Sequence, residues 1–331
     1  MILTNCAACA APLAHDAPRC VRCKTRYCNS TCQHDHWRRG HKQICKKIHR
    51  GGNAEQYHAD NKYKEAVAAA AEDCAEDTKG QTCYICTEAL HWKTKEGLVR
   101  RCACRGTSGF AHVSCLAEQA KILVEEAEEN NLDYTTLIDK FDRWTTCSLC
   151  EQEYHGVVRR ALGWACWKTY RGQPETEHLR WLAMVRLGAG LHATEQYAEA
   201  LVAFEGFLSN ARRMGQSEDD ILPAQTNVAN CYWKVGREDE ALSIERHVFA
   251  RQRELNGGGD EDTIISAMNL ANSLNNIGCY EETINILRGI IPAARDELGP
   301  EHIKTFSKNP SNLKLSSKNE IGLRGKIKKH F

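Results

Sequence analysis

The sequence has no apolar run long enough to span a membrane. Its most apolar patches, residues 66–71 and 161–170, are too short or too polar for a span of about 20 apolar residues. The first residues, MILTNCAACAAPL, lack the basic n-region of a secretory signal peptide, and Asn5 and the paired cysteines break their apolar stretch. We therefore expect no transmembrane segment, no signal peptide, and an intracellular protein that is cytoplasmic, nuclear or both.

An excess of one charge is also missing. The 44 Lys and Arg residues nearly balance the 43 Asp and Glu residues, which leaves a formal net charge of +1 at pH 7. A chain this close to neutral has no strong long-range field that would attract nucleic acid or an anionic membrane. We therefore expect proteins or peptides as its partners rather than nucleic acid or a membrane.

Cysteine, in contrast, is abundant. Of the 18 cysteines, 14 lie in two compact stretches, residues 6–45 and 83–150, and each stretch adds a suitably placed histidine. Paired C-x2-C knuckles in a chain without a signal peptide favour zinc in a reducing compartment over disulfides. The other cysteines lie singly in helical contexts, at Cys74, Cys166, Cys231 and Cys279. We expect these four to be buried free thiols.

The first cysteine stretch has the spacing C-x2-C-x10-C-x2-C-x4-C-x3-C-x8-H-x3-C. Its candidate zinc ligands are Cys6, Cys9, Cys20, Cys23, Cys28, Cys32, His41 and Cys45. Eight ligands satisfy two closed tetrahedral sites. A segment of this size has too little apolar surface to fold without the metal, so zinc is expected to be structural.

The run YCNSTCQHDHWRRGHKQIC, residues 27–45, resembles the second half of a MYND zinc finger. The likeness is carried by Tyr27–Cys28, Cys32–Gln33, Trp37, His41 and Cys45. The resemblance implies that Cys6, Cys9, Cys28 and Cys32 hold one zinc and that Cys20, Cys23, His41 and Cys45 hold the other. Three residues separate Trp37 from His41, one more than is commonest in the family, and we expect a local bulge to absorb the extra residue.

Residues 1–50 contain ten Lys and Arg against two Asp and Glu, so the finger itself is basic. It has no recognition helix and no RNA-stacking motif. The MYND resemblance implies a protein-binding module, and some such fingers take proline-rich peptides. We therefore favour a protein partner over nucleic acid. His34 and His36 are expected to be solvated surface residues, because the ligand set is complete without them.

The second cysteine stretch has the spacing C-x2-C-x15-C-x-C-x7-H-x2-C-x31-C-x2-C. Its candidate ligands are Cys83, Cys86, Cys102, Cys104, His112, Cys115, Cys147 and Cys150. They again satisfy two zinc sites, which gives about four Zn²⁺ per chain. Between the two stretches, residues 51–82 read as an Ala- and Glu-rich helical linker that begins after Gly51–Gly52 and ends at Gly80.

The single residue between Cys102 and Cys104 and the seven before His112 resemble a RING-CH zinc finger, as do the string RRCACRGTSGFAHVSCL and the Trp144 before CSLC. PHD fingers usually place more residues between the third and fourth ligands and fewer before the histidine. The resemblance implies a cross-brace. In it, one zinc is held by Cys83, Cys86, His112 and Cys115, and the other by Cys102, Cys104, Cys147 and Cys150.

Many RING-CH domains are ubiquitin ligases, which bind a ubiquitin-conjugating enzyme and orient its thioester. The resemblance places contacts for that enzyme at Ile85 and at Trp144, which could equally belong to the core. No catalytic residue is expected. The long insert between Cys115 and Cys147, the missing proline between Cys147 and Cys150, and Glu151 after the last ligand favour the alternative, a non-catalytic scaffold with purely structural zinc. Both interpretations stay open.

A repeat follows the second stretch. Residues 187–201, 228–242 and 270–284 share one pattern at offsets of 41 and 42 residues, each a helix, a short turn and a second helix. The pattern resembles the longer tetratricopeptide (TPR) repeats of kinesin light chains, through small residues at the helix crossing and the closing LGPEH. The crossing residues are Ala200, Ala241 and Thr283. A period above about 34 residues also admits HEAT-like stacking. The array is expected to present a concave protein-binding surface.

The predicted fold is multidomain, with two small zinc-stapled cross-brace domains followed by an all-α repeat array. We place a MYND-like finger at residues 1–50, the helical linker at 51–82, a RING-CH-like finger at 83–155 and about three repeats at 156–303. Trp164, Trp167 and Tyr170 are expected to pack a helix onto the finger or the first repeat. Residues 304–331 are basic and aperiodic, and are expected to be a disordered tail or a truncated fourth repeat.

Overall fold

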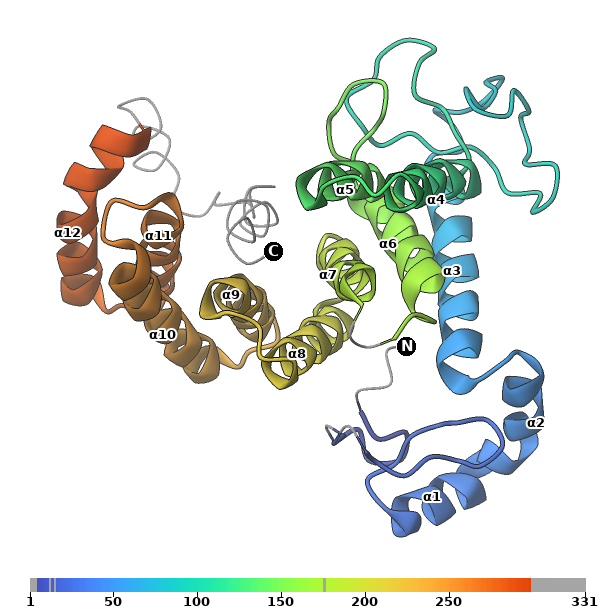
Figure 1. Cartoon of the computed structure of the whole chain (residues 1–331), viewed down its shortest axis with the longest axis horizontal. Coiled ribbons are helices and arrows are strands. Elements are labelled where there is room, and N and C mark those ends of the chain that lie inside the picture. The colour runs from blue at the N-terminus through green and yellow to red at the C-terminus, as the bar shows by residue number, and fades with distance from the viewer. Residues whose placement is uncertain (1–4, 12, 15, 175–176, 299–331) are drawn as a thin grey trace. The chain divides into compact units, whose positions relative to one another are not determined.

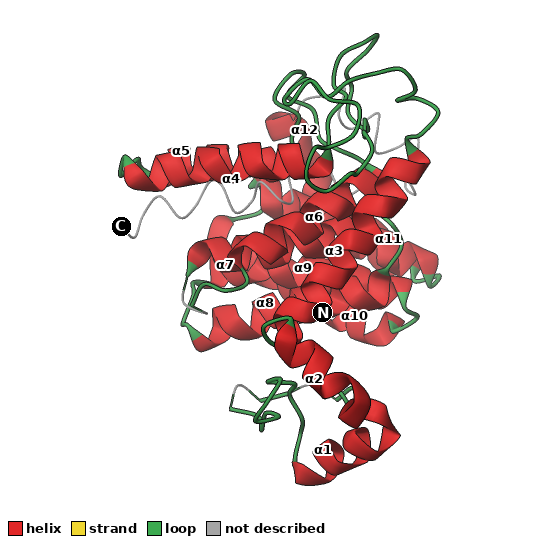
Figure 2. Ribbon diagram, turned by 90° about the vertical axis from the view of Figure 1, so that its right-hand side faces the viewer, coloured by secondary structure: helices red, strands yellow, loops and turns green. Residues whose placement is uncertain are grey.

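The computed structural model describes residues 5–11, 13–14, 16–174 and 177–298. The chain divides into two compact units, Met1–Phe207 and Leu208–Phe331. Within the described residues, the regular elements are helices, and extended pairing is limited to isolated bridges such as Arg19 with Arg26 (Figures 1 and 2). None of the helices described is long and apolar enough to cross a membrane. The predicted tail and fourth repeat lie outside the described residues.

The first zinc-ligand stretch ends in a broken helix. Helix α1, Ser30–His36, is capped by the Asn29 side chain, which accepts a hydrogen bond from the Cys32 N–H. A π-helical turn, Trp37–His41, joins it to α2, Lys42–Arg50. Gly40 in that turn has φ +128°, a conformation that favours glycine. A π-bulge is the usual way in which a helix accommodates one extra residue, so the predicted bulge is confirmed.

Helix α3, Ala54–Asp73, is more than a spacer. It packs against α6, Gly156–Tyr170, so residues 51–82 contribute to the core of the first unit. The alanines that favour the helix also give it a smooth buried face, formed by Ala54, Ala59, Ala66, Val67 and Ala70. Small side chains let two helices approach closely. The segment expected to be a helical linker is therefore helical, and it also packs against α6.

The insert between Cys115 and Cys147 is helical, as predicted. It contains α4, Val113–Glu129, α5, Tyr134–Phe141, and a single 3₁₀ turn, Asp142–Trp144. The Asp133 side chain caps α5 by accepting a hydrogen bond from the Thr136 N–H. The insert ends in a buried aromatic cluster, in which the Tyr170 ring of α6 contacts the rings of Phe141 and Trp144. The predicted packing of this bridging helix onto the finger is thus confirmed.

Helices α6 and α7, His178–His192, lie unusually close together. A Cβ atom at Gly163 would come within 2.9 Å of the Arg186 carbonyl oxygen, and one at Gly190 within 2.9 Å of the Arg159 carbonyl oxygen. Only glycine fits at these two positions. Because contact distance is set by the backbones themselves, α6 and the first repeat helix form one rigid pair.

Among the described residues, the repeat pattern appears as three successive pairs of helices joined by short turns. The pairs are α7 with α8, Tyr197–Arg213; α9, Glu218–Lys234, with α10, Glu238–Asn256; and α11, Glu261–Asn276, with α12, Tyr280–Leu298. In the second unit each helix from α9 to α12 packs on its neighbour along the chain. The predicted crossing residues Ala200, Ala241 and Thr283 are all buried.

One prediction about the isolated cysteines is wrong. Cys74, Cys166 and Cys231 are buried, but Cys279 is exposed. It lies in the turn before α12, where its carbonyl oxygen accepts the Thr283 N–H and its own N–H binds the Leu274 carbonyl oxygen. A turn between two repeat helices faces solvent, whereas the same residue inside a helix would face the core. The sequence pattern did not separate these two cases.

Candidate metal centres

In the described part of the chain, sixteen Cys and His side chains gather into four clusters, and in each cluster the ligand atoms lie within 4.8 Å of one another. The clusters are Cys6–Cys9–Cys28–Cys32, Cys20–Cys23–His41–Cys45, Cys83–Cys86–His112–Cys115 and Cys102–Cys104–Cys147–Cys150. These are the residues and the groupings that the sequence and its two resemblances indicate. Within each stretch the two clusters interleave along the chain, so that each metal would join segments far apart in sequence.

The distances within the clusters fit zinc. The sulfur atoms are 3.4 Å apart in Cys9–Cys28, 3.8 Å in Cys20–Cys45 and 3.7 Å in Cys104–Cys147. A tetrahedral site with Zn–S bonds of about 2.3 Å has edges of about 3.8 Å, whereas a disulfide needs about 2.05 Å. All-cysteine and Cys₃His sets are typical of structural zinc. Four such clusters are consistent with about four zinc ions per chain.

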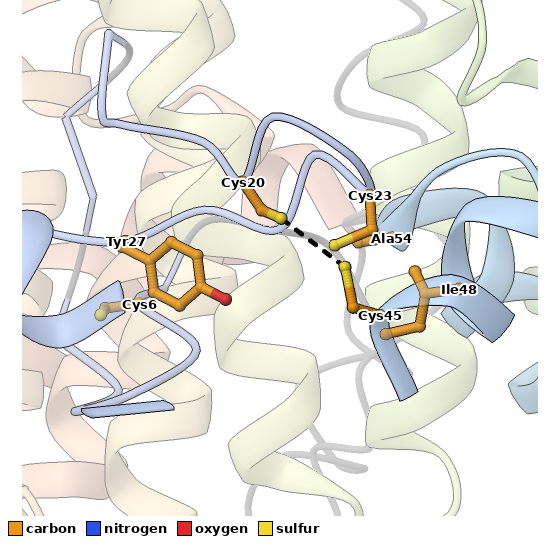
Figure 3. Close-up of a cluster of buried hydrophobic side chains, with 7 residues drawn as sticks. All are labelled: Cys6, Cys20, Cys23, Tyr27, Cys45, Ile48 and Ala54. Atoms are coloured by element: carbon orange, nitrogen blue, oxygen red, sulfur yellow. Dashed lines mark hydrogen bonds between the residues drawn. The ribbon is translucent and has the colours of Figure 1, made fainter. Parts of the chain in front are cut away.

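In the N-terminal stretch, short backbone turns position the thiols. Figure 3 shows Cys20, Cys23 and Cys45 with their sulfur atoms turned toward one another beside Ile48 and Ala54. The Ala54 N–H donates to the Cys23 carbonyl oxygen at 2.7 Å, which ties the start of α3 to this knuckle. The finger and α3 therefore share a small core that closes around the metal site.

The π-helical turn sets the position of the N-terminal imidazole. It brings Nε2 of His41 to 3.3 Å from Sγ of Cys23, so Nε2 is the ligand atom. His36, expected on the surface, is half-buried: its ring stacks on His41 at 4.8 Å, and its Nδ1 is hydrogen-bonded to the Tyr27 hydroxyl at 3.0 Å. His34 is exposed, as predicted. The bulge brings His36 and His41 together, and the one-residue excess in spacing was its only signal in the sequence.

The central imidazole uses its other nitrogen. Nδ1 of His112 lies 3.3 Å from Sγ of Cys86 and 3.6 Å from Sγ of Cys115. Its Nε2 lies 3.4 Å from the Ala89 carbonyl oxygen, to which an Nε2–H can donate. A carbonyl on the far nitrogen fixes the tautomer and the ring orientation of a metal-binding histidine. The cluster is thus arranged for coordination through Nδ1.

The thiols are electrostatically unequal. Burial raises the pKa of Cys6, but the backbone N–H groups around it outweigh burial and lower that pKa to about 6. Hydrogen bonds with Cys9 and Cys6 raise the pKa of Cys28 to about 12. Burial and a hydrogen bond with Cys20 raise the pKa of Cys45 to about 12. In the first cluster Cys6 ionises readily and Cys28 resists ionisation, and in the second cluster Cys45 resists it, so complete ionisation of either cluster requires a bound cation.

The two predicted contacts for a conjugating enzyme differ in their exposure to solvent. Ile85 is 36% exposed, but Trp144 is only 1% exposed and belongs to the aromatic core, so it offers no contact surface. Leu149 in the last knuckle is 51% exposed, and sequence reasoning missed it. The Tyr84 and Ser148 hydroxyls are hydrogen-bonded at 3.0 Å, which holds the first and last knuckles together. Ile85 and Leu149 each follow one member of this bonded pair.

The central cross-brace is anchored to helices on both sides. Arg101, next to the ligand Cys102, forms an ion pair with Asp73 at the end of α3 at 2.5 Å. Asp142, just before the last knuckle, forms a buried ion pair with Arg186 of α7 at 2.8 Å, and both side chains are 7% exposed. The knuckles therefore depend on helices before and after the finger in sequence. The central finger is therefore not a structurally independent domain.

Comparison with known proteins agrees with part of this organisation. Residues 6–45 match the family model of the MYND finger. No curated protein sequence matches the chain. The chain thus contains an N-terminal MYND zinc finger, two further Cys/His clusters and an all-helical array of TPR-like repeats. Zinc-binding MYND fingers and such repeats are protein-interaction modules.

Two crystal structures of TPR-like repeats resemble the chain, both from a Podosopora anserina protein described as a kinesin light chain. Each is 16% identical in sequence. One match covers 57% of this chain and 99% of the other, with a TM-score of 0.39. The second covers 56% and 97%, with a TM-score of 0.38. At TM-scores this low the likeness carries no argument, so the assignment of the repeats rests on the chain's own helix pairs.

Proposed function

We propose that this chain is a zinc-dependent ubiquitin-protein ligase. In this proposal the sixteen clustered Cys and His residues are the ligands of four structural zinc ions. The central module binds a ubiquitin-conjugating enzyme, and the MYND finger and the repeats select the substrate protein. The coarser statement, a protein-interaction function, follows from the MYND finger and the repeats alone.

The observation that carries the proposal is the surface formed by the two knuckles of the central module. Ile85 and Leu149 are exposed aliphatic side chains, one in each knuckle. The Tyr84–Ser148 hydrogen bond brings the two knuckles side by side, and Oε1 of Gln119 in α4 lies 3.4 Å from both hydroxyls. Exposed aliphatic side chains on a rigid support are the usual centre of a protein interface.

Zinc would take no direct part in the reaction. Four protein ligands fill each tetrahedral site, which leaves no open position for substrate or water. The module would act by holding a conjugating enzyme so that its thioester is oriented toward a substrate lysine. Such positioning accelerates a reaction by lowering its entropic cost.

A reconstituted ubiquitination assay tests the proposal. The zinc-loaded chain is incubated with ubiquitin, activating enzyme, ATP and a panel of conjugating enzymes. We expect ubiquitin chains with at least one member, and a loss of about tenfold or more for Ile85→Ala and for Leu149→Ala, as is usual for residues at the centre of an interface. Leu90→Ala is the matched control, because Leu90 is 58% exposed in the same module but lies outside both knuckles.

The second candidate is a non-catalytic scaffold. Glu151, which follows the last ligand, has φ +56° and carries a negative charge. A ligase module would be expected to carry a cation at this position, whereas a scaffold needs none, so Glu151 favours the scaffold. An absence of ubiquitin chains across the panel, with zinc content intact, would leave the scaffold as the function. Activity that is unchanged in both Ile85→Ala and Leu149→Ala would contradict the proposed surface, whatever the source of the activity.

A further inference from the structure

The second unit contains a small cavity between three of its helices. Its volume is about 20 Å³. Its lining residues are Pro223 and Thr226 of α9, Gln252 of α10, and Asp262, Ile265, Ser266 and Asn269 of α11. A cavity needs about 10–15 Å³ to hold one water-sized group. There is therefore room for one such group, and little more.

Three polar atoms around this cavity are available as acceptors. Gln252 is only 6% exposed, and its Oε1 is buried without a hydrogen-bond partner. The Thr226 hydroxyl donates to the Leu222 carbonyl oxygen at 3.2 Å, and the Ser266 hydroxyl donates to the Thr263 carbonyl oxygen at 2.9 Å. With their protons used in this way, both hydroxyls offer only lone pairs to a ligand. A group that brings hydrogen-bond donors can therefore satisfy Oε1 of Gln252 and the two hydroxyls.

The charge around the cavity has the matching sign. The first turn of α9 carries Glu218, Asp219 and Asp220. Asp260 is the N-cap of α11, and the first turn of that helix carries Glu261 and Asp262. Arg251, beside Gln252, is engaged by Glu218 at 2.5 Å. Residues 208–298 contain 15 Asp and Glu against 9 Lys and Arg. A cation that approaches this edge is attracted to it.

We propose that this cavity receives the ammonium group of a lysine from a basic segment of a partner protein. The inference rests on the proposed protein-binding role of the repeats, and it specifies the chemistry of the partner. An ammonium is compact and carries three donors and no acceptor, so it suits a space of about 20 Å³ better than the larger, planar guanidinium of arginine. Pro223 and Ile265 provide apolar walls for the methylene chain.

Peptide arrays test the proposal with the full zinc-loaded chain. The probes are short basic peptides that each contain one lysine in a varied background, followed by matched versions with acetyl-lysine or arginine at that position. We expect binding that requires the lysine. Binding should weaken by about tenfold or more with either replacement, because acetyl-lysine carries no charge and the planar guanidinium does not have the compact shape of the ammonium.

Variants of Gln252 test whether the lysine binds in the cavity. Gln252→Leu removes the buried acceptor and should weaken lysine-dependent binding by about tenfold or more. Gln252→Glu keeps the shape, adds a negative charge and should bind at least as tightly as the parent chain. Arg253→Gln is the matched control for Gln252→Glu, because both variants lower the net charge of α10 by one and Arg253 is exposed. Thermal unfolding of each variant shows whether the second unit still folds.

Several results would overturn the lysine pocket. Among them are binding that is indifferent to acetylation, equal binding of arginine peptides, and undiminished binding by Gln252→Leu. An array without any lysine-dependent peptide would overturn it as well. Peptides that bind equally well with and without their lysine would contradict lysine binding in the cavity, but the repeats would remain a protein-binding surface. The ubiquitination assay measures the activity of the central module and does not depend on Gln252. The failure of one proposal can therefore be told apart from the failure of the other.

Discussion

Two glycines near the central zinc ligands differ in what surrounds them. Gly109 has φ +85°, and a Cβ atom there would come within 2.6 Å of Cβ and 2.9 Å of Sγ of Cys104. Gly106 has φ +61°, and a Cβ atom there would meet nothing within 4 Å. Both substitutions to alanine cost about 1–2 kcal/mol of backbone strain. Only the change at Gly109 also displaces a zinc ligand.

We therefore expect Gly109→Ala to release zinc from the central module to a chromophoric chelator much faster than the parent chain. Gly106→Ala should release it at nearly the parental rate. Equal release rates for the two variants would show that Cys104 is not held where the structure places it. The prediction needs only zinc release, so it is independent of any ligase activity.

Glu245 gives the second unit a dependence on pH. Burial raises its pKa to about 7 from the ordinary 4.5, although the Trp233 indole N–H donates to its carboxyl at 3.0 Å. The carboxyl ionises more easily in the unfolded chain than in the folded one. Its contribution to stability is therefore greatest below about pH 4.5 and is lost as the pH rises to about 7, at a cost of about 3 kcal/mol.

Glu245→Gln removes this titration and keeps the shape of the side chain. The variant should gain stability relative to the parent chain as the pH rises from about 5.5 to about 8, while zinc remains bound. Hydrogen exchange in α10, compared between variant and parent at each pH, measures the difference. A difference that is the same at both pH values would contradict the assigned titration.

At the scale of elements, the buried ion pair between Asp142 and Arg186 joins the insert of the central finger to the first repeat helix. Arg186→Leu would leave the Asp142 carboxylate buried without its cation, which typically costs about 3–5 kcal/mol. We expect a marked fall in the midpoint of thermal unfolding. The double variant Arg186→Leu, Asp142→Leu should recover much of the loss. An unchanged midpoint in the single variant would show that the finger and α7 are not coupled.

The elements differ in how far the sequence predicted them. The candidate zinc ligands follow from the spacing of the cysteines and histidines, whereas their grouping into four sites is what the resemblance to the two zinc-finger families implies. The repeat helices follow from a regular pattern of small and apolar residues. The sequence of helix α3 predicts a helix but not its packing, because an Ala-rich segment suits both a solvated spacer and a tightly packed helix. Only its partner α6, about a hundred residues later, distinguishes the two.

Single positions in irregular segments were harder to predict. Trp144 lies in a 3₁₀ turn and Cys279 in an interhelical turn, where no period of apolar residues reports which way a side chain faces. Leu149 was overlooked because its exposure depends on the fold of the last knuckle. Tyr84 and Ser148 are 64 residues apart in sequence, so no local pattern could have predicted their hydrogen bond.

At the scale of the whole molecule, the zinc sites and the helices are interdependent in the first unit. The N-terminal finger shares its core with the start of α3, and the central finger holds Asp73 at the end of the same helix. His112→Ala is therefore expected to destabilise α3 and α6 as well as the central module. Hydrogen exchange would show increased exchange in both helices. An effect confined to residues 83–155 would indicate independent modules instead.

The zinc content of the folded chain is the most direct measure of its organisation around four metal sites. Native mass spectrometry of the intact protein, purified without chelator, counts the bound ions, and we expect about four zinc per chain, two in each cysteine stretch. Cys6→Ser and Cys102→Ser should each lower the count, since each removes one ligand from a different stretch. A folded chain that carries no more than two zinc ions, or one whose mass shows disulfides in place of metal, would contradict the account.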